Sequence, residues 1–234
     1  MTIPIRKYEY PKYAKKTIKV KRKVNRNDFK FKVKDKKKVK IRVIKIKENS
    51  ILTEQSTETM EVEEGEIKAN LEKDIIKISV IERHKATGNM SLGFVKGFGI
   101  KSGAAASTVA HDSHNIIVIG VSEEDMAKAV NKLIEIGGGM IVVKDGRLLA
   151  LVELPVAGLI SEDEAEVVCR KIEKLKQAWK ELECKIKSPF MTMSILALPV
   201  IPELRITDKG LIDVTQFKKV SVLMENQFPS NKLK

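Results

Sequence analysis

The sequence predicts an α+β fold, with a mixed β-sheet, flanking helices and antiparallel strands in its N-terminal part. Apolar and charged residues alternate within the first fifty positions, which is typical of half-buried strands. Residues 74–82 form a nearly continuous apolar run, as in a central strand of a sheet. Between residues 116 and 182, strand-like runs alternate with segments of helical apolar spacing. A chain of 234 residues is long enough to bury a substantial core.

The first strands are predicted in a lysine-rich segment. Apolar residues alternate with lysine or arginine at 29–33 and again at 39–43. We expect two half-buried strands, joined through Asp35–Lys38 into a hairpin with one apolar face and one lysine face. At Val43–Ile44 the alternation shifts by one residue, which indicates either a bulge or a strand covered on both faces.

The positive charge of the chain is concentrated in this segment. The formal net charge is +13, but residues 1–47 hold 20 Lys and Arg against 3 Asp and Glu, and the rest holds 24 against 28. Nucleic-acid surfaces usually add arginine and aromatic contacts, whereas this segment has four arginines and the whole chain a single Trp. We therefore interpret the lysines as a solvated sheet face that protects an edge, and do not expect nucleic acid as a partner.

The middle of the chain consists of three segments with different amino-acid compositions. Residues 49–73 are acidic and predict a short hairpin or a loop, and 74–82 predict a central strand. Residues 85–115 are rich in glycine and alanine, which indicates positive φ values or a close backbone approach. The pair Gly97–Gly99 does not continue into a dinucleotide-binding motif, because the third glycine is one position late.

A β-α-β-β unit followed by a long helix is predicted next. Residues 116–121 form a strand, Ser122 caps a helix that ends at Gly137, and the strands 140–143 and 148–154 pair around a tight turn. Ser161 and Glu164 are expected to form a capping box for a helix that reaches Leu182 and places Trp179 in the core.

The C-terminal part is apolar and contains several prolines. Because Pro199 and Pro202 interrupt residues 189–206, we expect extended and irregular chain there and no helix. Residues 218–223 predict a last strand, and 226–234 a frayed tail. We divide the chain into a basic β-rich segment 1–73, a mixed domain 74–225 and the tail, although 1–225 can also form one domain.

Four classes of protein are not expected: secreted proteins, membrane proteins, zinc ribbons and thioredoxin-like redox proteins. The first thirteen residues lack the apolar core of a secretory signal, and no apolar run approaches the ~20 residues of a membrane helix. Cys169 and Cys184 belong to no C-x-x-C pair, which argues against zinc ribbons and thioredoxin-like redox chemistry. We therefore expect a soluble, cytoplasmic protein with no membrane partner.

All three histidines lie in one window of the chain, at His84, His111 and His114. The run His111-Asp112-Ser113-His114 precedes a predicted strand, and loops at strand ends often carry function. His111, Asp112 and His114 could bind a metal, with His84 or water as the fourth ligand, but only if a turn brings residues 111 and 114 to one side. Alternatively, Asp112 could orient a histidine for acid–base chemistry, or these side chains could simply satisfy backbone groups. The H-x-E and P-C-x-x-C signature of zinc nucleobase deaminases is absent.

Several long strings of the chain are distinctive: ERHKATGNMSLGFVKGFGIKSGAAASTVAHDSHNIIVIG at 82–120, GGGMIVVKDG at 137–146, LPVAGLIS at 154–161 and PFMTMSILALPVIPELRITDKGLIDV at 189–214, with YPKYAKKT and VKIRVIKIKENSILT upstream. Together they resemble the C-terminal domain of the amidohydrolase-type adenine deaminases. The similarity covers about residues 10 to 225.

The resemblance implies a hydrolase that converts adenine to hypoxanthine and ammonia in purine salvage. In that family a pair of divalent metals, manganese or iron, activates a bridging water, and a β/α barrel that precedes this domain binds them through an H-x-H motif and further ligands. No H-x-H occurs in these 234 residues, so the family's metal ligands are not in this chain. The chemistry is therefore expected to need a separate barrel chain.

The polar positions inside the matching strings are the site residues that the resemblance implies. They are expected to line the face that meets the barrel, with His111, Asp112 and His114 as catalytic candidates. The further substrate-binding or barrel-facing candidates are Arg83, His84, Ser113 and Asn115. Glu203 and Asp208 are weaker candidates, and the alternative for them is a structural role as caps of turns.

Three functions remain open at this level. The first is one subunit of a split adenine deaminase, acting with a separate barrel chain or as a homo-oligomer. The second is a free-standing purine-binding or regulatory module, and the third is a basic nucleic-acid-binding domain.

Overall fold

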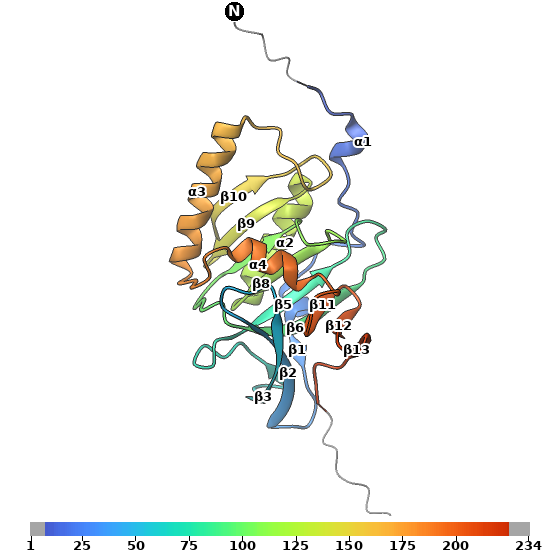
Figure 1. Ribbon diagram of the computed structural model, residues 1–234, viewed down its shortest axis with the longest axis vertical. Coiled ribbons are helices and arrows are strands. Elements are labelled where there is room, and N and C mark those ends of the chain that lie inside the picture. Colours follow the sequence, from blue (N-terminus) through green and yellow to red (C-terminus); the bar gives the residue numbers. More distant parts are fainter. Residues whose placement is uncertain (1–7, 225–234) are drawn as a thin grey trace, which may run out of the picture.

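A computed structural model describes residues 8–224 of the protein (Figure 1). Its helices are α1 (Lys12–Lys15), the 3-10 helix η1 (Arg26–Phe29), α2 (Glu123–Ile136), α3 (Ala165–Glu181) and α4 (Pro189–Leu196). Its strands are β1 (Phe31–Lys32), β2 (Lys38–Ile46), β3 (Thr53–Glu61), β4 (Glu66–Ile67), β5 (Ile75–Ile81), β6 (Met90–Lys96), β7 (Ala104–Ser107), β8 (Ile116–Gly120), β9 (Gly139–Lys144), β10 (Arg147–Glu153), β11 (Leu204–Thr207), β12 (Gly210–Asp213) and β13 (Lys218–Val220). The expected tail at 226–234 lies outside the described residues.

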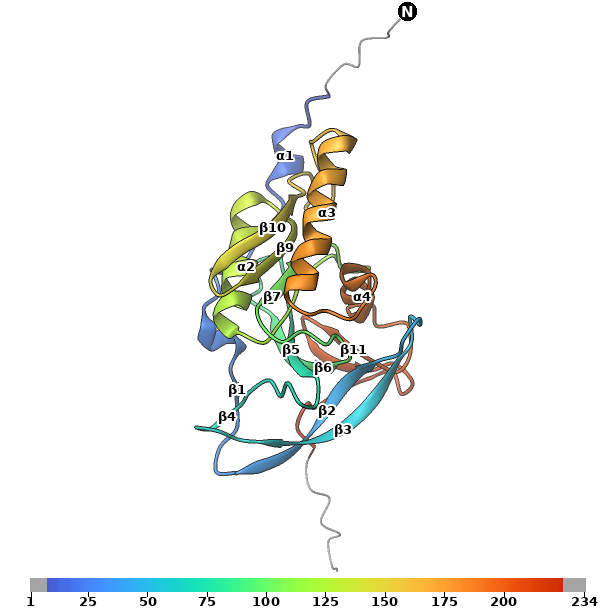
Figure 2. The same cartoon turned by 90° about the vertical axis from the view of Figure 1, so that its left-hand side faces the viewer.

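An eight-stranded sheet, in the order β10-β9-β7-β8-β5-β6-β2-β3, forms the centre of the molecule. All neighbours are antiparallel except β2 and β6, so the sheet is mixed. Helix α2 covers one face and helices α3 and α4 the other, as Figure 2 shows for the β9–β10 end. On β9, Val142 faces α3 while Ile141 and Val143 face α2, in keeping with the two-residue period of a strand. The predicted α+β fold with flanking helices is confirmed.

The predicted N-terminal hairpin is wrong. The segment 29–33 contains the end of η1 and the short strand β1, which pairs with β4 instead of β2. Strand β2 pairs along its whole length with β3, the acidic segment expected to be a short hairpin or loop. Lysines of β2 face glutamates of β3, with ion pairs Lys38–Glu61 of 2.6 Å and Lys45–Glu54 of 2.8 Å. Opposite charges across strands favour this pairing, whereas β3 has no apolar alternation that would have indicated a strand.

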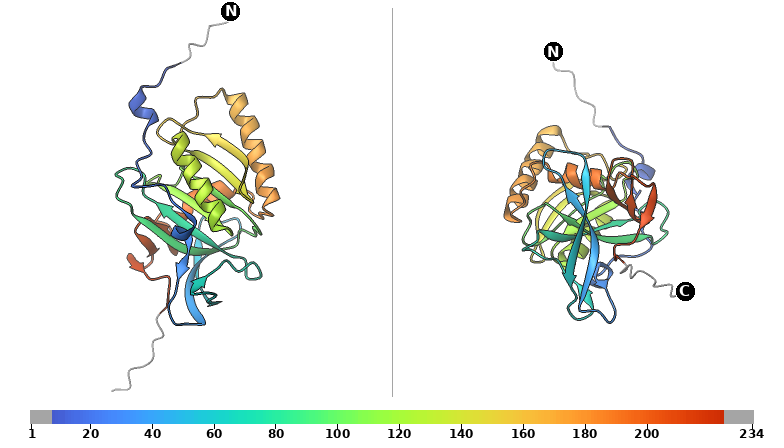
Figure 3. Two further views of the ribbon diagram at one scale, coloured as in Figure 1. Left: turned by 180° about the vertical axis from the view of Figure 1, so that it is seen from behind. Right: turned by 60° about the horizontal axis from the view of Figure 1, so that its bottom comes forward.

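The shift of the apolar pattern at Val43–Ile44 comes from burial on both faces. The pairing of β2 with β3 runs from Lys38 to Ile46 without a change of register, so there is no bulge. Val43 and Ile44 are both fully buried, in separate apolar clusters on the two sides of the sheet. The right-hand view of Figure 3 shows how far β2 and β3 extend across the molecule.

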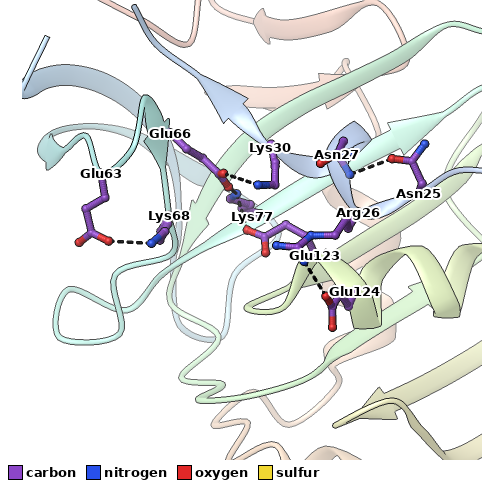
Figure 4. A network of polar contacts seen from close by, with 10 residues as sticks. All are labelled: Asn25, Arg26, Asn27, Lys30, Glu63, Glu66, Lys68, Lys77, Glu123 and Glu124. Carbon is purple, nitrogen blue, oxygen red and sulfur yellow. Dashed lines mark hydrogen bonds and ion pairs between the residues drawn. The ribbon is translucent and has the colours of Figure 1, made fainter. Parts of the chain in front are cut away.

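Strand β5 is central, as predicted, and carries a buried cation. All seven residues of β5 are buried, and β6 and β8 flank it. Lys77 Nζ lies 3.0 Å from Glu66 Oε1 and 2.6 Å from Glu123 Oε1, and Lys30 Nζ lies 3.2 Å from Glu66 Oε2 (Figure 4). Burial of Glu66 opposes its ionisation, but the hydrogen bonds and positive charges of Lys77 and Lys30 together outweigh burial and keep the pKa of this carboxyl below its ordinary value. The network ties β4 and the first turn of α2 to the central strand.

The predicted β-α-β-β unit is confirmed as β8, α2, β9 and β10. Ser122 Oγ accepts a hydrogen bond from the backbone N of Asp125, and Gly137 ends the helix with φ of 87°. The Asp125 carboxylate accepts hydrogen bonds from the backbone N of Asp145 and Gly146, at 3.1 and 2.8 Å. This second contact fixes the hairpin turn to the start of α2.

The long helix is present, but its predicted capping box is wrong. Helix α3 begins after Glu164, which makes no side-chain cap, and Ser161 Oγ accepts from the backbone N of Asp163 instead. Trp179 is buried at 4% exposure and contacts Phe98 and Phe190, as its place on the apolar stripe predicted.

The prediction that residues 189–206 contain no helix is also wrong. Residues 189–196 form α4, because Pro189 occupies the first helical position, where no backbone N–H is needed. Pro199 and Pro202 lie beyond the end of this helix, and the chain then becomes extended in β11. The predicted last strand is present as β13.

The glycine- and alanine-rich segment contains two strands that the sequence did not predict, β6 and β7. Strand β7 (AAAS) is fully buried between β8 and β9. Small residues let α2 approach the sheet here: a Cβ on Gly120 would lie 2.7 Å from Met126 Cγ and 2.8 Å from Ala104 Cβ. Across residues 8–224, no helix has the length and apolar character that a membrane span requires.

Residues 17–25 connect α1 to η1 along the outside of α2, on the side seen in the left-hand view of Figure 3. The side chain of Asn131 in α2 makes two hydrogen bonds with the backbone of Val24, of 3.0 and 2.8 Å. The backbone N of Lys19 donates to the carbonyl of Arg83 at 2.8 Å. These contacts bring the N-terminal segment to the end of β5.

Candidate functional site

The three histidines come from two loops at one end of the central strands β5 and β8. The pair Ile81–Ile116 is the last in the antiparallel ladder of β5 and β8. Because the end of β5 lies beside the start of β8, the loop 82–89 meets the loop 110–115. We call the surface formed by these two loops the histidine face.

A turn at 111–113 brings the histidine side chains together. The rings of His111 and His114 are 5.5 Å apart between centroids, with an angle of 65° between their planes. His84 Nε2 lies 2.6 Å from the carbonyl oxygen of Ser113. The turn that residues 111 and 114 need in order to face the same side is therefore present.

His114 is held in one orientation. Its Nδ1 accepts a hydrogen bond from the backbone N of Ala110 at 3.2 Å, so in the neutral ring the proton is on Nε2. Burial lowers the pKa of His114, and the positive charges of His111 and Arg83 add to this effect. Near neutral pH, His114 therefore offers one N–H donor on a neutral imidazole.

Arg83 joins the histidine face to a neighbouring loop. Its guanidinium is 1% exposed and donates from Nε to the carbonyl oxygen of His114, and from Nη2 to that of Ala157 at 3.1 Å. Among the described residues, Nη1 has no hydrogen-bond partner. Burial lowers the pKa of Arg83 to about 10. Gly158 lies against the guanidinium, since a Cβ there would be 2.8 Å from Nη1.

Glu82 organises the loop that carries His84, a role that the sequence did not predict. Its carboxylate accepts from the backbone N of His84, Lys85 and Thr87 at 2.5, 2.8 and 2.9 Å, and from the Thr87 hydroxyl at 3.0 Å. Burial alone would raise the pKa of Glu82, but these donors lower it to about 2. The sequence did contain a sign of this role, because the Glu82 carboxyl follows the predicted strand directly and the turn residues Thr87 and Gly88 come soon after it.

Asn115 belongs to the histidine face and Asp208 contacts it, whereas Glu203 lies elsewhere. The Asn115 side chain accepts from the backbone N of Arg83 at 3.3 Å and donates to Asp208 Oδ1 at 3.4 Å. Asp208, in the turn between β11 and β12, also accepts from Asn89 Nδ2 at 3.2 Å. Glu203 instead accepts from the backbone N of Gln55 on β3, at 2.9 Å. Asp112 and Ser113 are exposed at the tip of the turn.

The histidine face does not form a metal site. Within the part of the chain that the structure describes, no group of three or more His, Cys, Asp or Glu side chains is placed to hold an ion. His84 Nε2 and His114 Nδ1 already contact backbone groups. The arrangement suits hydrogen bonding to a polar ligand better than metal binding.

Comparison with known proteins gives a family. The model of the family "Adenine deaminase C-terminal domain" matches residues 50–218. Adenine deaminase of Clostridium botulinum is 46% identical over 96% of this chain and 38% of its own length. Adenine deaminase of Moorella thermoacetica is 49% identical over 77% of this chain and 30% of its own, and that of Methanothrix thermoacetophila 51% over 78% and 32%. The chain spans about a third of the length of these relatives.

Proposed function

Because the chain belongs to the family of adenine deaminase C-terminal domains, we propose that it serves the hydrolytic deamination of adenine to hypoxanthine and ammonia. In this proposal the chain is the part of the enzyme that closes over the purine, beside a catalytic part that other residues supply. More than half of each relative's length lies outside the match, which leaves room for such a part.

The overlap of the family match with the histidine face carries the proposal. Residues 50–218 include both histidine loops and the turn of Asp208. Several hydrogen bonds that join these segments, such as Asn115 to Asp208, hold loops in place and contribute nothing to the sheet itself. A set of loops fixed in this way around histidines is typical of a binding surface.

The metal chemistry is assigned to the catalytic part. A divalent metal pair, manganese or iron, would supply an activated water in that part, and the described residues of this chain do not fit such a pair. The role left to this chain is to bind and orient the purine and to exclude bulk water.

His114 and Asp112 are the side chains we assign to the purine. Ring nitrogens of adenine accept hydrogen bonds and its amino group donates them. The Nε2–H of neutral His114 suits a ring nitrogen, and the exposed Asp112 carboxylate suits the amino group. Arg83 and Asn115 are positioning residues, because they act through the two loops that they join. His84, His111 and Ser113 complete the wall of the site.

The cellular setting follows from the proposed reaction. Release of hypoxanthine and ammonia from adenine places the protein in purine salvage, in the cytoplasm. The partner is a separate amidohydrolase barrel chain; a homo-oligomer is the alternative.

A purine-binding or regulatory module without catalysis is the second candidate. It is favoured by the absence of a metal-ligand group among residues 8–224. Nucleic-acid binding has less support, because lysines of β2 form ion pairs with glutamates of β3 and are partly neutralised.

A chimera tests the proposal. This sequence replaces the matching segment of the Clostridium botulinum enzyme, and ammonia release from adenine is measured. We expect kcat/KM within about tenfold of that of the relative. A folded, metal-loaded chimera without activity would contradict the proposal. Calorimetry of the unmodified chain with adenine then tests the second candidate, which requires saturable binding without the barrel.

A further inference from the structure

Helix α4 has no polar face, yet it lies at the surface. Its sequence, PFMTMSIL, is apolar except for Thr192 and Ser194, and the Ser194 side chain is buried. Met193 and Leu196 are buried in the core, but Met191 is 56% exposed. A helix that is apolar nearly all round is normally enclosed, so the outer side of α4 lacks the cover that its sequence predicts.

Other exposed apolar side chains gather beside α4. Ile51 and Leu52, in the turn between β2 and β3, are 55% and 42% exposed and line a groove of about 350 Å³ together with Met191. Val200, 68% exposed, follows α4 in the chain. Figure 2 shows α4 and the turn between β2 and β3 on the same side of the molecule. We call Ile51, Leu52, Met191 and Val200 the α4 surface.

A buried arginine holds the α4 surface in shape. Arg205 is fully buried and donates to the carbonyl oxygens of Ile51 at 2.7 Å, Pro202 at 3.0 Å and Ile201 at 2.6 Å. The turn between β2 and β3 is therefore fixed to the chain that follows α4. A preformed apolar surface binds with a smaller loss of conformational entropy than a flexible one.

The rim of the groove is basic. Lys185 and Lys187 line the groove on one side, and Lys47 and Glu48 line it where β2 ends, with Lys47 paired to Glu54 at 3.1 Å. An apolar centre with a charged rim is the usual anatomy of a protein–protein interface. The matching surface would be apolar with acidic side chains around it.

Helix α4 also contacts the loop that carries His111. The backbone N of His111 donates to Ser194 Oγ of α4 at 3.2 Å, and Ser194 is 2% exposed. Helix α4 and the turn that carries His111 and His114 are therefore fixed to each other.

We propose that the α4 surface docks on the catalytic part of an adenine deaminase, the part that this chain does not match in its relatives. The proposal rests on the proposed function and names the surface through which the two parts join. The occupant is inferred from two observations: the relatives carry more than half of their length outside this domain, and α4 is anchored to the face assigned to the purine. A second copy of this chain would leave the histidine face without a catalytic partner.

The same chimera, with a protease site at its junction, tests the docking proposal independently of the proposed function. After cleavage, the affinity between the two pieces is measured, with Met191→Glu and Val200→Glu introduced singly and together. Leu148→Glu on β10 is the matched control, since Leu148 is 46% exposed and outside the α4 surface. We expect the double variant to weaken association at least about tenfold and the control to leave it unchanged.

Each substitution is also introduced into this chain outside the chimera, and thermal unfolding shows whether the variant folds. Because all three side chains are exposed, we expect all three variants to fold. Pieces that stay together equally well in the α4-surface variants and the control would overturn the docking proposal, even if the chimera deaminates adenine. So would a homodimer of the unmodified chain that the same variants dissociate. A folded chimera that is inactive although its pieces bind through the α4 surface would contradict the proposed function alone.

Discussion

The backbone N–H of His111 donates a hydrogen bond to the hydroxyl of Ser194, with 3.2 Å between N and Oγ. Through this bond helix α4, 83 residues further along the chain, supports the turn that carries two of the three histidines. Helix α4, which carries an exposed apolar side chain at Met191, and the histidine face are therefore fixed to each other.

Ser194→Ala should loosen this turn. We expect a loss of about 1 kcal/mol in the free energy of unfolding, because a buried hydrogen bond is removed and the His111 N–H loses its partner. Ser188→Ala is the control, since Ser188 precedes the same helix and makes no side-chain cap. Urea unfolding of the two variants checks this, and equal losses would contradict the role given to Ser194.

His114→Ala should lower adenine deamination by the chimera. Losing a hydrogen-bond donor to the purine is expected to reduce kcat/KM by about 10- to 100-fold. The pKa of His114 is lowered, so the ring stays neutral at pH 7 and the activity that depends on it should fall only as pH drops below the ordinary value for histidine. Lys85→Ala, an exposed neighbour of His84, is the control. A pH profile unchanged by His114→Ala would exclude this role.

Gly158→Ala should disturb the loop beside Arg83. Gly158 has φ of 72°, and a Cβ there would lie 2.8 Å from Arg83 Nη1. Gly146 is a matched control, because its φ is 70° and a Cβ at this position would have no neighbouring atom within 4 Å. We expect Gly146→Ala to cost about 1 kcal/mol from backbone strain alone, and Gly158→Ala at least about twice that. Similar losses in thermal or urea unfolding would show that the contact with Arg83 is unimportant.

Glu82→Gln should change how stability depends on pH. The pKa of Glu82 is about 2 in the folded protein, against an ordinary value of 4.5, so its ionised form stabilises the fold above pH 4.5. That contribution is lost as pH falls from 4.5 through about 2. Glu82→Gln should therefore be less stable than the unmodified protein at pH 7, and the difference should shrink towards pH 2. Urea midpoints at pH 7, 4 and 2.5 test this; a constant difference would contradict it.

Lys77→Met should be strongly destabilising. The Lys77 ammonium group is fully buried and lies within 3.0 Å of both Glu66 and Glu123. Its loss therefore leaves two partly buried carboxylates without their shared cation. We expect a loss of about 3 kcal/mol. Lys45→Met removes an exposed pair with Glu54 and should cost no more than about 1 kcal/mol. Chemical unfolding of both variants measures the contrast, and comparable losses would contradict the importance of burial.

Elements with a strong local pattern were predictable. The run 74–82 indicated a central strand, and Ser122 and Gly137 marked the ends of α2, because capping and continuous burial depend on neighbours in the sequence. Strand β7 was not predictable in this way, since three alanines carry no alternation. Helix α4 was not predicted because prolines flank and begin it, although Pro189 is compatible with a helix start.

The amino-acid sequence by itself determined the α+β fold, the β-α-β-β unit and the family, and it marked the segments that hold the histidines. Only the tertiary structure decided that β2 pairs with β3, that Asp208 contacts the histidine face and Glu203 does not, and that Ser194 supports His111. The physical reason is that these contacts join residues far apart in the chain, and their partners are fixed by strand register and core packing.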